Sequence, residues 1–388
     1  MVNSKLDYPF KHSSYQLPFV DFEVNRDESL KNLKYITDKE NSYIFVNGES
    51  GIGKSILLKQ LAYELGRNVI ALFIDPVSNL GMSDSFIKND ISEQISWLVQ
   101  DKTSIDKVDL NQRSDHYVQY ISMLAQYTKK SEQRVVMIID GLDDIQDKSY
   151  VENILGLIPF HLPGVKFIIS SNSQMVLDRF TKRKEAIAHF SVPLMTNVEC
   201  KVLLGDTVTI EDVESIISVY EPLPEKISSI RRIINKGHSV NDLLNGYGEY
   251  NNSILDAEWR LNENRISENL TLISLLVFCP FSATLDELHS VLSLDCISIN
   301  SLLSDFSFLK VNDSVVTFAN VGFKRYLTEK LLKDKNIIKL ELGLFVARRS
   351  RTADNILTIV EYKFTESDYE GVISELADGA LVEVYKEK

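Results

Sequence analysis

The feature that most constrains this chain is a glycine-rich run of eight residues, Gly-Glu-Ser-Gly-Ile-Gly-Lys-Ser, at positions 48–55. Its glycines permit backbone angles that turn several N–H groups inward, and a helix that follows would add the positive end of its dipole. Such a run forms an anion cradle, and its spacing is that of the phosphate-binding P-loop. Residues 43–47 and 56–65 have the apolar patterns of the strand and the helix that must flank it. The alternative is a glycine-rich turn without a ligand.

The P-loop pattern assigns roles to particular residues. Lys54 is predicted to reach the β- and γ-phosphates of ATP and to act in catalysis, and the Ser55 hydroxyl is predicted to bind Mg²⁺. The expected cofactors are therefore ATP or ADP together with Mg²⁺. Nucleotide contacts are predicted throughout the loop and the first helical turn, namely at Gly48, Ser50, Gly51, Ile52, Gly53, Lys54, Ser55 and Ile56.

Carboxylates follow another buried stretch, residues 135–139, in the run Asp-Gly-Leu-Asp-Asp. Asp140, at the end of the strand, is predicted to hold the hydration shell of the magnesium ion and to be needed for catalysis. Asp143 and Asp144 come one turn later and are predicted to orient or deprotonate the attacking water. An acidic surface turn after a strand is the alternative for all three.

Polar residues also follow the buried stretch at 165–170, where Ser171 and Asn172 come next. Ligands of open α/β sheets bind outside the carboxyl ends of the strands, so these two side chains are predicted to face the γ-phosphate. Capping of the next helix is the alternative.

Apolar strands and helical stretches alternate through the first half of the chain. Strands are predicted at 43–47, 69–74, 135–139 and 165–170, and helices from 26 onward before the loop and at 56–65, 83–100 and 112–130. This alternation predicts an α/β fold with a doubly wound parallel sheet covered by helices on both faces.

Beyond Pro193 the strand signals fade and helices broken by proline and glycine follow. Helices at 269–278 and 298–306, a capping box from Thr284 to Glu287 and a hairpin at Asn312-Asp313 then predict a winged helix. The predicted domains are an N-terminal arm (1–20), a P-loop nucleotide-binding domain (21–196), a helical domain (197–266), a winged-helix domain (267–332) and a short helical C-terminal segment (333–388).

Composition excludes several other classes of protein. A net charge of −13 opposes nonspecific binding to nucleic acid, which depends on clustered Lys and Arg, although a basic stretch occurs at 179–184. The three cysteines are scattered and indicate neither a disulfide framework nor a zinc site. No apolar run reaches the roughly 18 residues that a membrane span requires, and no secretory signal is evident, so we expect a cytoplasmic protein without membrane contact.

Taken together, residues 20–330 resemble the STAND class of signal-transduction ATPases, especially its NACHT-like and AP-ATPase-like members. The more specific matches are the acidic run that begins at Asp140 and the end of the winged helix. The segment 22–30 is similar to the family motif that lies near the adenine, which places Arg26 in the nucleotide site. The segment 190–194, followed by Glu199, is similar to the link into the helical domain, and 317–327 is similar to the end of the winged helix.

The resemblance implies a nucleotide-dependent switch, held by ADP at rest, that oligomerises or engages partners on activation, in immune or defence signalling. Self-association or separate effector and sensor chains are the expected partners, unless the sequence is a piece of a longer protein. Three residues depart from the family pattern: Asp144 where glutamate is common, Asn172 where an arginine is usual, and Asn320 where a histidine helps to hold ADP. We therefore expect nucleotide binding with slow hydrolysis.

Two other functions stay open. An AAA+ initiator-type ATPase that handles DNA also joins a P-loop to a winged helix, and it would bind DNA through the region from Lys310 to Arg325. A pseudo-ATPase scaffold would bind nucleotide for stability alone. Small GTPases are disfavoured, because the chain contains no Asn-Lys-x-Asp guanine motif.

Overall fold

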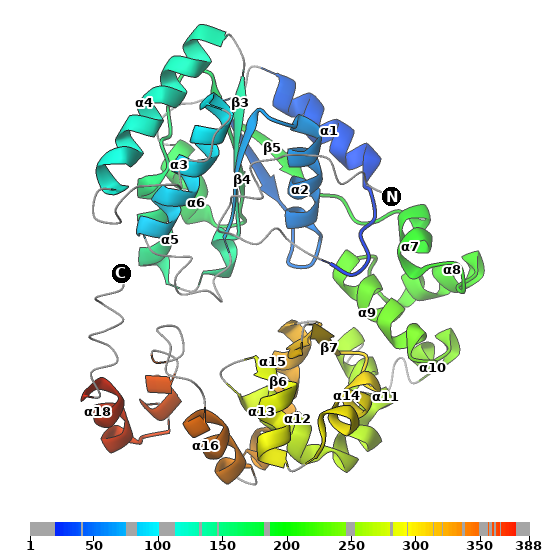
Figure 1. Ribbon diagram of the computed structural model, residues 1–388. Coiled ribbons are helices and arrows are strands. Elements are labelled where there is room, and N and C mark those ends of the chain that lie inside the picture. Colours follow the sequence, from blue (N-terminus) through cyan, green and yellow to red (C-terminus); the bar gives the residue numbers. More distant parts are fainter. Residues whose placement is uncertain are drawn as a thin grey trace. The chain divides into compact units, whose positions relative to one another are not determined.

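The chain forms two compact units, residues 1–195 and 196–388, in the computed structural model (Figure 1). The structure describes residues 20–39, 42–74, 84–100, 113–131, 134–145, 147–181, 187–245, 253–279, 282–292, 294–312, 314–319, 321–335 and 338–348, and most residues between 356 and 377. The boundary lies one residue before the predicted end of the nucleotide-binding domain. The predicted arm falls almost entirely outside the described residues.

Unit 1 is built on a five-stranded sheet, in which every described strand pair is parallel and the order is β2-β3-β4-β1-β5. The predicted parallel α/β sheet is thus confirmed. The strands are β1 (Tyr43–Asn47), β2 (Val69–Phe73), β3 (Val135–Asp140), β4 (Val165–Ser170) and β5 (Ile187–Ser191). The sequence analysis did not predict β5, because at the sheet edge only Phe190 of this strand is buried and no continuous apolar run results.

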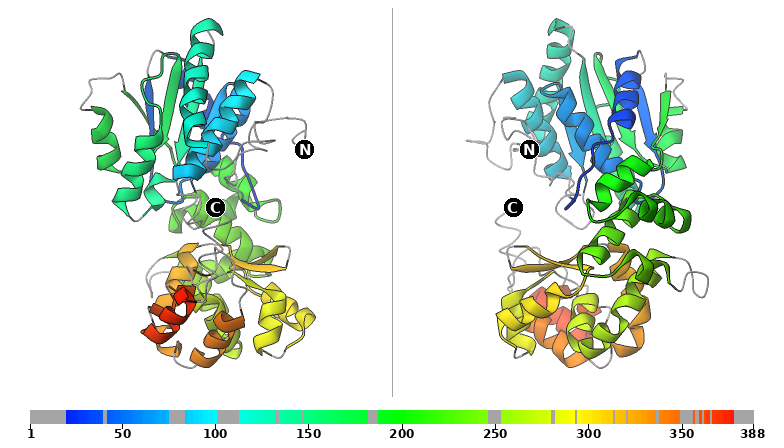
Figure 2. Two further views of the ribbon diagram at one scale, coloured as in Figure 1. Left: turned by 60° about the vertical axis from the view of Figure 1, so that its left-hand side comes forward. Right: turned by 90° about the vertical axis from the view of Figure 1, so that its right-hand side faces the viewer.

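Helices cover both faces of this sheet (Figures 1 and 2). One face carries α1 (Asp27–Asp38) and α2 (Lys54–Leu65). The other carries α3 (Asp84–Gln100), α4 (Arg113–Ser131), α5 (Lys148–Leu157) and α6 (Gln174–Thr181). Successive side chains of a strand point to opposite faces, so each strand contributes alternate residues to the two layers.

This alternation decides which face the strand-end residues occupy. Met137 and Ile139 of β3 and Phe167 and Ile169 of β4 pack in the core under α3–α6. The residues between them therefore face α1 and α2. Lys166 shows this directly, because its ammonium donates to backbone carbonyls at the end of α1.

The free edge of β2 is covered by a side chain of α3. The side-chain amide of Gln94 accepts a hydrogen bond from the Ala71 N–H (2.8 Å) and donates one to the Ala71 carbonyl (2.9 Å). It also donates to Asp90 at 3.0 Å, and both polar side chains are fully buried. An amide that pairs with both groups of an edge residue satisfies the backbone there as another strand would.

Among the described residues, unit 2 begins with the helices α7 (Asn197–Leu204), α8 (Ile210–Val219), α9 (Pro224–Asn235), α10 (Val240–Leu244) and α11 (Ile254–Glu268). Side-chain capping boxes open several of them, and the N-terminal Thr or Ser of each box is found at Thr196, Thr209 and Ser239. Polar side chains that bond the first free N–H groups explain why these short helices begin where they do.

The rest of unit 2 combines helices with a small antiparallel sheet of order β6-β8-β7. The elements are α12 (Leu270–Phe278), β6 (Ala283–Thr284), α13 (Leu285–Leu292), α14 (Cys296–Ser304), β7 (Leu309–Asn312), β8 (Val315–Phe318), α15 (Val321–Lys330), η6 (Leu332–Asp334), α16 (Lys339–Arg348) and α18 (Tyr369–Ala377). The predicted capping box is present, since Thr284 and Glu287 each accept a hydrogen bond from the other's backbone N–H. The finer division at 266/267 and 332/333 stays a prediction.

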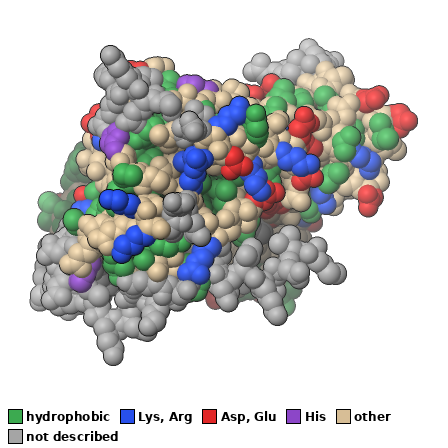
Figure 3. Space-filling view, turned by 90° about the horizontal axis from the view of Figure 1, so that it is seen from above, with side chains coloured by type: hydrophobic (Ala, Val, Ile, Leu, Met, Phe, Trp, Pro, Cys, Tyr) green, Lys and Arg blue, Asp and Glu red, His purple; other side chains and the backbone are tan. Residues whose placement is uncertain are grey.

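Charge and hydropathy add two observations. On the face drawn in Figure 3, Lys and Arg side chains lie among Asp and Glu side chains. None of the described helices is long and apolar enough to cross a membrane.

Candidate functional site

The glycine-rich run lies between β1 and α2, as its pattern predicts. Gly51 and Gly53 have positive φ angles of 81° and 90°, a conformation that favours glycine, and Gly53 is the N-cap residue directly before α2. The Leu57 N–H donates to the Gly53 carbonyl at 3.0 Å, so the N–H groups of residues 54–56 precede the first bond within the helix. With no acidic residue in that first turn, this end of α2 suits an anion.

Lys54 folds back over the loop that precedes it. Its ammonium donates to the Gly48 carbonyl at 2.5 Å and to the Glu49 carbonyl at 3.2 Å. The positive charge therefore lies beside the loop, where a phosphate chain on the α2 N-terminus would meet it. Ser55, the predicted magnesium ligand, comes next and is half-buried.

Asp140 is brought to the same place by the strand register. Val46 pairs with Ser170 across β1 and β4, and Ile139 pairs with Ile169 across β3 and β4. Asp140 is thus level with Val46, two strand spacings away, which is about 10 Å. It follows Ile139 and so faces the α2 side of the sheet, where it is only 4% exposed.

Glycine is required directly after Asp140. Gly141 has a φ of 92°, and a Cβ atom there would overlap the Ile74 carbonyl oxygen at the end of β2. The Ile74 N–H in turn donates to the Asp140 carbonyl at 3.0 Å. The small residue of the acidic run therefore lets the chain turn tightly against the neighbouring strand.

Asp143 and the residues after β4 form one connected network. The Ser171 hydroxyl donates to Asp143 Oδ1 at 2.6 Å, and the Asn172 N–H donates to Asp143 Oδ2 at 2.7 Å. The Asn172 side chain donates to the Gly48 carbonyl at 2.6 Å and accepts from the Gly48 N–H at 3.0 Å. The structure thus joins the acidic run, the end of β4 and the P-loop, which sequence analysis had treated as separate elements.

The other predicted site residues are placed as follows. Ser50 is exposed, and Ile52 is 2% exposed, so the Ile52 side chain packs inside the protein. The backbone of Asp144 belongs to a short turn, η5 (Leu142–Asp144), while its side chain and the whole of Asn320 lie outside the described residues. The nucleotide, metal and catalytic roles of all these residues stay predictions.

Arg26 occupies a buried position that sequence analysis did not foresee. Its guanidinium donates to the Ile52 carbonyl at 3.2 Å, to the Pro193 carbonyl at 2.7 Å and to the Leu194 carbonyl at 3.0 Å. One side chain therefore ties the P-loop to the segment that follows β5. The side chain is 5% exposed.

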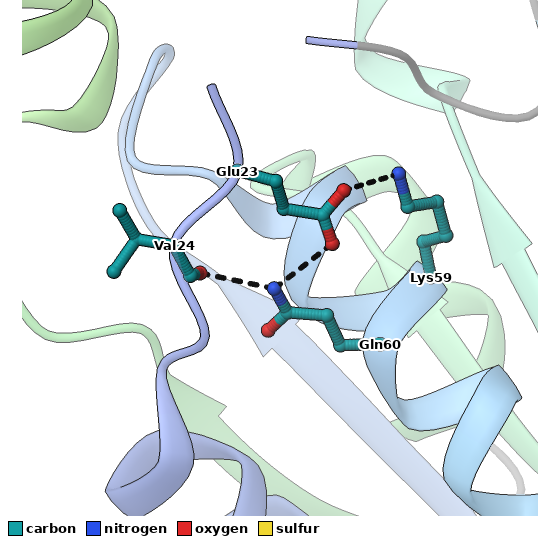
Figure 4. A network of polar contacts seen from close by, with 4 residues as sticks. All are labelled: Glu23, Val24, Lys59 and Gln60. Carbon is teal, nitrogen blue, oxygen red and sulfur yellow. Dashed lines mark hydrogen bonds and ion pairs between the residues drawn. The ribbon is translucent and has the colours of Figure 1, made fainter. Parts of the chain in front are cut away.

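The residues just before Arg26 are bound to α2 by an ion pair and hydrogen bonds (Figure 4). Glu23 binds the Lys59 ammonium at 2.6 Å and accepts a hydrogen bond from the Gln60 amide at 3.0 Å. The same Gln60 amide donates to the Val24 carbonyl at 3.0 Å. Lys59 and Gln60 are both buried in α2, and no pattern in the sequence marked them for this contact.

The predicted protein ligands of the magnesium ion, Ser55 and Asp140, suit Mg²⁺ only if a bound nucleotide supplies further oxygen atoms. Among the residues that the structure describes, no three His, Cys, Asp or Glu side chains gather as a metal site. Mg²⁺ is commonly held by one or two protein oxygens together with phosphate oxygens and water, and Ser55 and Asp140 could supply the protein oxygens.

Comparison with known proteins agrees with this reading of the fold. Residues 23–192 match the family model described as an ATPase domain predominantly from Archaea. No curated protein matches the chain. Among solved structures, a STAND protein with a tetratricopeptide repeat sensor from Pyrococcus horikoshii is similar, with 12% identity and a TM-score of 0.56. The similarity covers 97% of this chain and 52% of that protein, so this chain spans about half of its length.

Two further solved structures are more distant. A Walker-type ATPase of Pyrococcus abyssi has 14% identity and a TM-score of 0.42, over 78% of this chain and 95% of that one. The Orc1 protein of Aeropyrum pernix, solved in complex with DNA, has 15% identity and a TM-score of 0.28, over 83% of this chain and 96% of that one. Similarities as weak as these do not bear on the function of this chain.

Proposed function

We propose that this chain is a nucleotide-dependent molecular switch, because residues 23–192 match a family model of ATPase domains and the fold is similar to that of a STAND protein. At rest the protein holds ADP, and exchange for ATP releases it to self-associate or to engage partner chains. Slow hydrolysis of ATP returns it to rest. The observation that carries this proposal is the position of Asp140, level with the end of β1 and on the sheet face that α2 covers.

Each part of the site has a role in this proposal. The first-turn N–H groups of α2 and the Lys54 ammonium bind the phosphates, and Ser55 and Asp140 hold the magnesium ion. When bound, Mg²⁺ neutralises charge on the phosphate oxygens. A nucleotide can drive a switch only if it binds the two states with different affinity, which is why ADP and ATP must be compared.

Binding is tested with fluorescent ADP and ATP on the full chain. Lys54→Ala is expected to weaken both nucleotides by roughly a hundredfold, about 3 kcal/mol, because it removes the cation from the phosphates. Asp140→Ala is expected to abolish the dependence of binding on Mg²⁺. Lys34→Ala is the matched control, since Lys34 forms an exposed ion pair with Glu64. Unchanged affinity in Lys54→Ala would refute the nucleotide site.

Switching is tested by light scattering of the full chain with ADP and with a non-hydrolysable ATP analogue. The ATP analogue is expected to raise the mass of the particle, alone or with added partner chains, and ADP is expected to leave it unchanged. Nucleotide that co-purifies with the protein is expected to be ADP. A mass that no nucleotide or partner changes would contradict the switch.

One observation favours a second candidate, a scaffold that binds nucleotide without hydrolysing it. Both carboxylate oxygens of Asp143 already accept hydrogen bonds from the end of β4. Turnover that disappears in Asp140→Ala would exclude the scaffold, whereas no turnover together with strong thermal stabilisation by ATP would support it.

A further inference from the structure

We propose that Asn172 and Asp143 form a latch that positions the P-loop. In this latch the Asn172 side chain holds the backbone of Gly48, and the Asp143 carboxylate holds Asn172. Both are therefore positioning residues, and Asp143 is not the base that activates water. The inference rests on the proposed nucleotide site and adds to it the device that keeps its loop in shape.

The first half of the latch is the double hydrogen bond between Asn172 and Gly48. The Gly48 N–H donates to Asn172 Oδ1 at 3.0 Å, and Asn172 Nδ2 donates to the Gly48 carbonyl at 2.6 Å. The backbone partners fix the orientation of the amide, because an N–H can only donate and a carbonyl can only accept. The Ser171 N–H donates to the Val46 carbonyl at 3.2 Å, which continues the backbone pairing of β4 with β1. The Asn172 side chain extends this pairing into the loop.

The second half is the double hydrogen bond that Asp143 accepts. Ser171 Oγ lies 2.6 Å from Asp143 Oδ1, and the Asn172 nitrogen lies 2.7 Å from Asp143 Oδ2. Hydrogen bonds to an ionised carboxylate are about twice as strong as neutral ones. Rotation of the Asp143 carboxylate away from these two donors would break both bonds and release the backbone of Asn172.

The Gly48 carbonyl shows why the loop needs this support. It accepts hydrogen bonds from Lys54 Nζ at 2.5 Å and from Asn172 Nδ2 at 2.6 Å. A bound phosphate chain would draw the Lys54 ammonium away from this carbonyl, and Asn172 would then remain as its donor. The loop can thus bind nucleotide without first rebuilding its backbone.

The latch makes a prediction that separates it from a sensor of the γ-phosphate. Asn172 holds the loop backbone, which ADP and ATP both contact, so losing it should weaken both nucleotides alike. A residue that bonds the γ-phosphate would weaken ATP alone. A general base would lower turnover and leave both affinities unchanged.

The experiment is a double-mutant cycle on the full chain with fluorescent ADP and ATP. Asn172→Ala and Asp143→Asn are each expected to raise both Kd values by roughly tenfold, the loss of one to two hydrogen bonds. The double variant is expected to be no weaker than Asn172→Ala, because Asp143 acts through Asn172. In turnover measurements on both single variants, KM for ATP should rise by a larger factor than kcat falls. Controls are Asp147→Asn, whose carboxylate caps α5 by accepting from Ser149 N–H, and Gln174→Ala.

Three results would overturn the latch. The first is a double variant in which the two losses of binding free energy add. The second is an Asn172→Ala variant that binds ATP more weakly but ADP normally. The third is an Asp143→Asn variant that loses turnover while both Kd values stay unchanged. Ser171→Ala, which removes one donor to Asp143, gives the same test with a smaller expected effect if Asp143→Asn fails to fold. The Lys54→Ala variant separates the two proposals. If this variant binds nucleotide normally, the proposed nucleotide site is refuted. If it loses binding while the Asn172 and Asp143 variants keep theirs, only the latch is refuted.

Discussion

Removing the Arg26 guanidinium should destabilise unit 1 strongly. Arg26→Ala deletes a buried donor that contacts three carbonyls, Ile52 at 3.2 Å, Pro193 at 2.7 Å and Leu194 at 3.0 Å. A hydrogen bond from a charged donor contributes about 1.5–3 kcal/mol. Counting the two bonds that share Nη2 as one, the free energy of unfolding should fall by about 3–6 kcal/mol, a large part of the 5–15 kcal/mol typical of a domain.

Urea unfolding followed by tryptophan fluorescence measures this loss. The chain has two tryptophans, Trp97 in unit 1 and Trp259 in unit 2, so a Trp259→Phe background reports on unit 1 alone. With an m value of about 2–3 kcal/mol/M, the unfolding midpoint should fall by roughly 1–3 M. Nucleotide affinity should fall too, because the Ile52 carbonyl belongs to the P-loop.

Two variants make the measurement specific. Arg26→Lys should recover less than half of the loss, since one ammonium cannot reproduce the fork of a guanidinium. Arg134→Ala, which removes an exposed bond to the Asp38 carbonyl at 3.1 Å, should cost less than about 1 kcal/mol. A loss in Arg26→Ala no larger than that of Arg134→Ala would refute the reasoning.

Three further predictions follow from buried groups. Gln94→Leu should cost unit 1 about 2–4 kcal/mol in urea unfolding, because the N–H and carbonyl of Ala71 lose their partner. Gly141→Ala should abolish magnesium-dependent nucleotide binding, measured with fluorescent ATP, because its Cβ overlaps the Ile74 carbonyl and displaces Asp140. Burial raises the pKa of Glu258 to about 7 from 4.5, so Glu258→Gln should remove a pH-dependent loss of stability in unit 2.

The sign of the Glu258 effect follows from its two pKa values. The unfolded chain releases this proton near pH 4.5, whereas the folded chain keeps it until about pH 7, so stability falls as pH rises through that window. The fall is about 3 kcal/mol, and Trp259 fluorescence in a Trp97→Phe background reports it. If the free energy of unfolding depends on pH equally in the parent and in Glu258→Gln, this prediction is contradicted. A Gln94→Leu variant as stable as its parent, or normal magnesium dependence in Gly141→Ala, would contradict the other two.

Sequence patterns predicted those features of the fold that depend on neighbouring residues. The strand before the P-loop, the helix after it and the strand that ends at Asp140 are all present. Such elements follow from apolar periodicity and turn chemistry within a few residues. The edge strand β5 escaped prediction because one buried residue does not make a pattern.

The sequence alone therefore determined that a glycine-rich loop and a buried carboxylate would meet at one edge of a parallel sheet. Only the tertiary structure decided what surrounds them. Asn172 meets Gly48 across 124 residues and Arg26 meets Pro193 across 167. These hydrogen bonds leave no local periodicity, because the partners become neighbours only when the strands have paired.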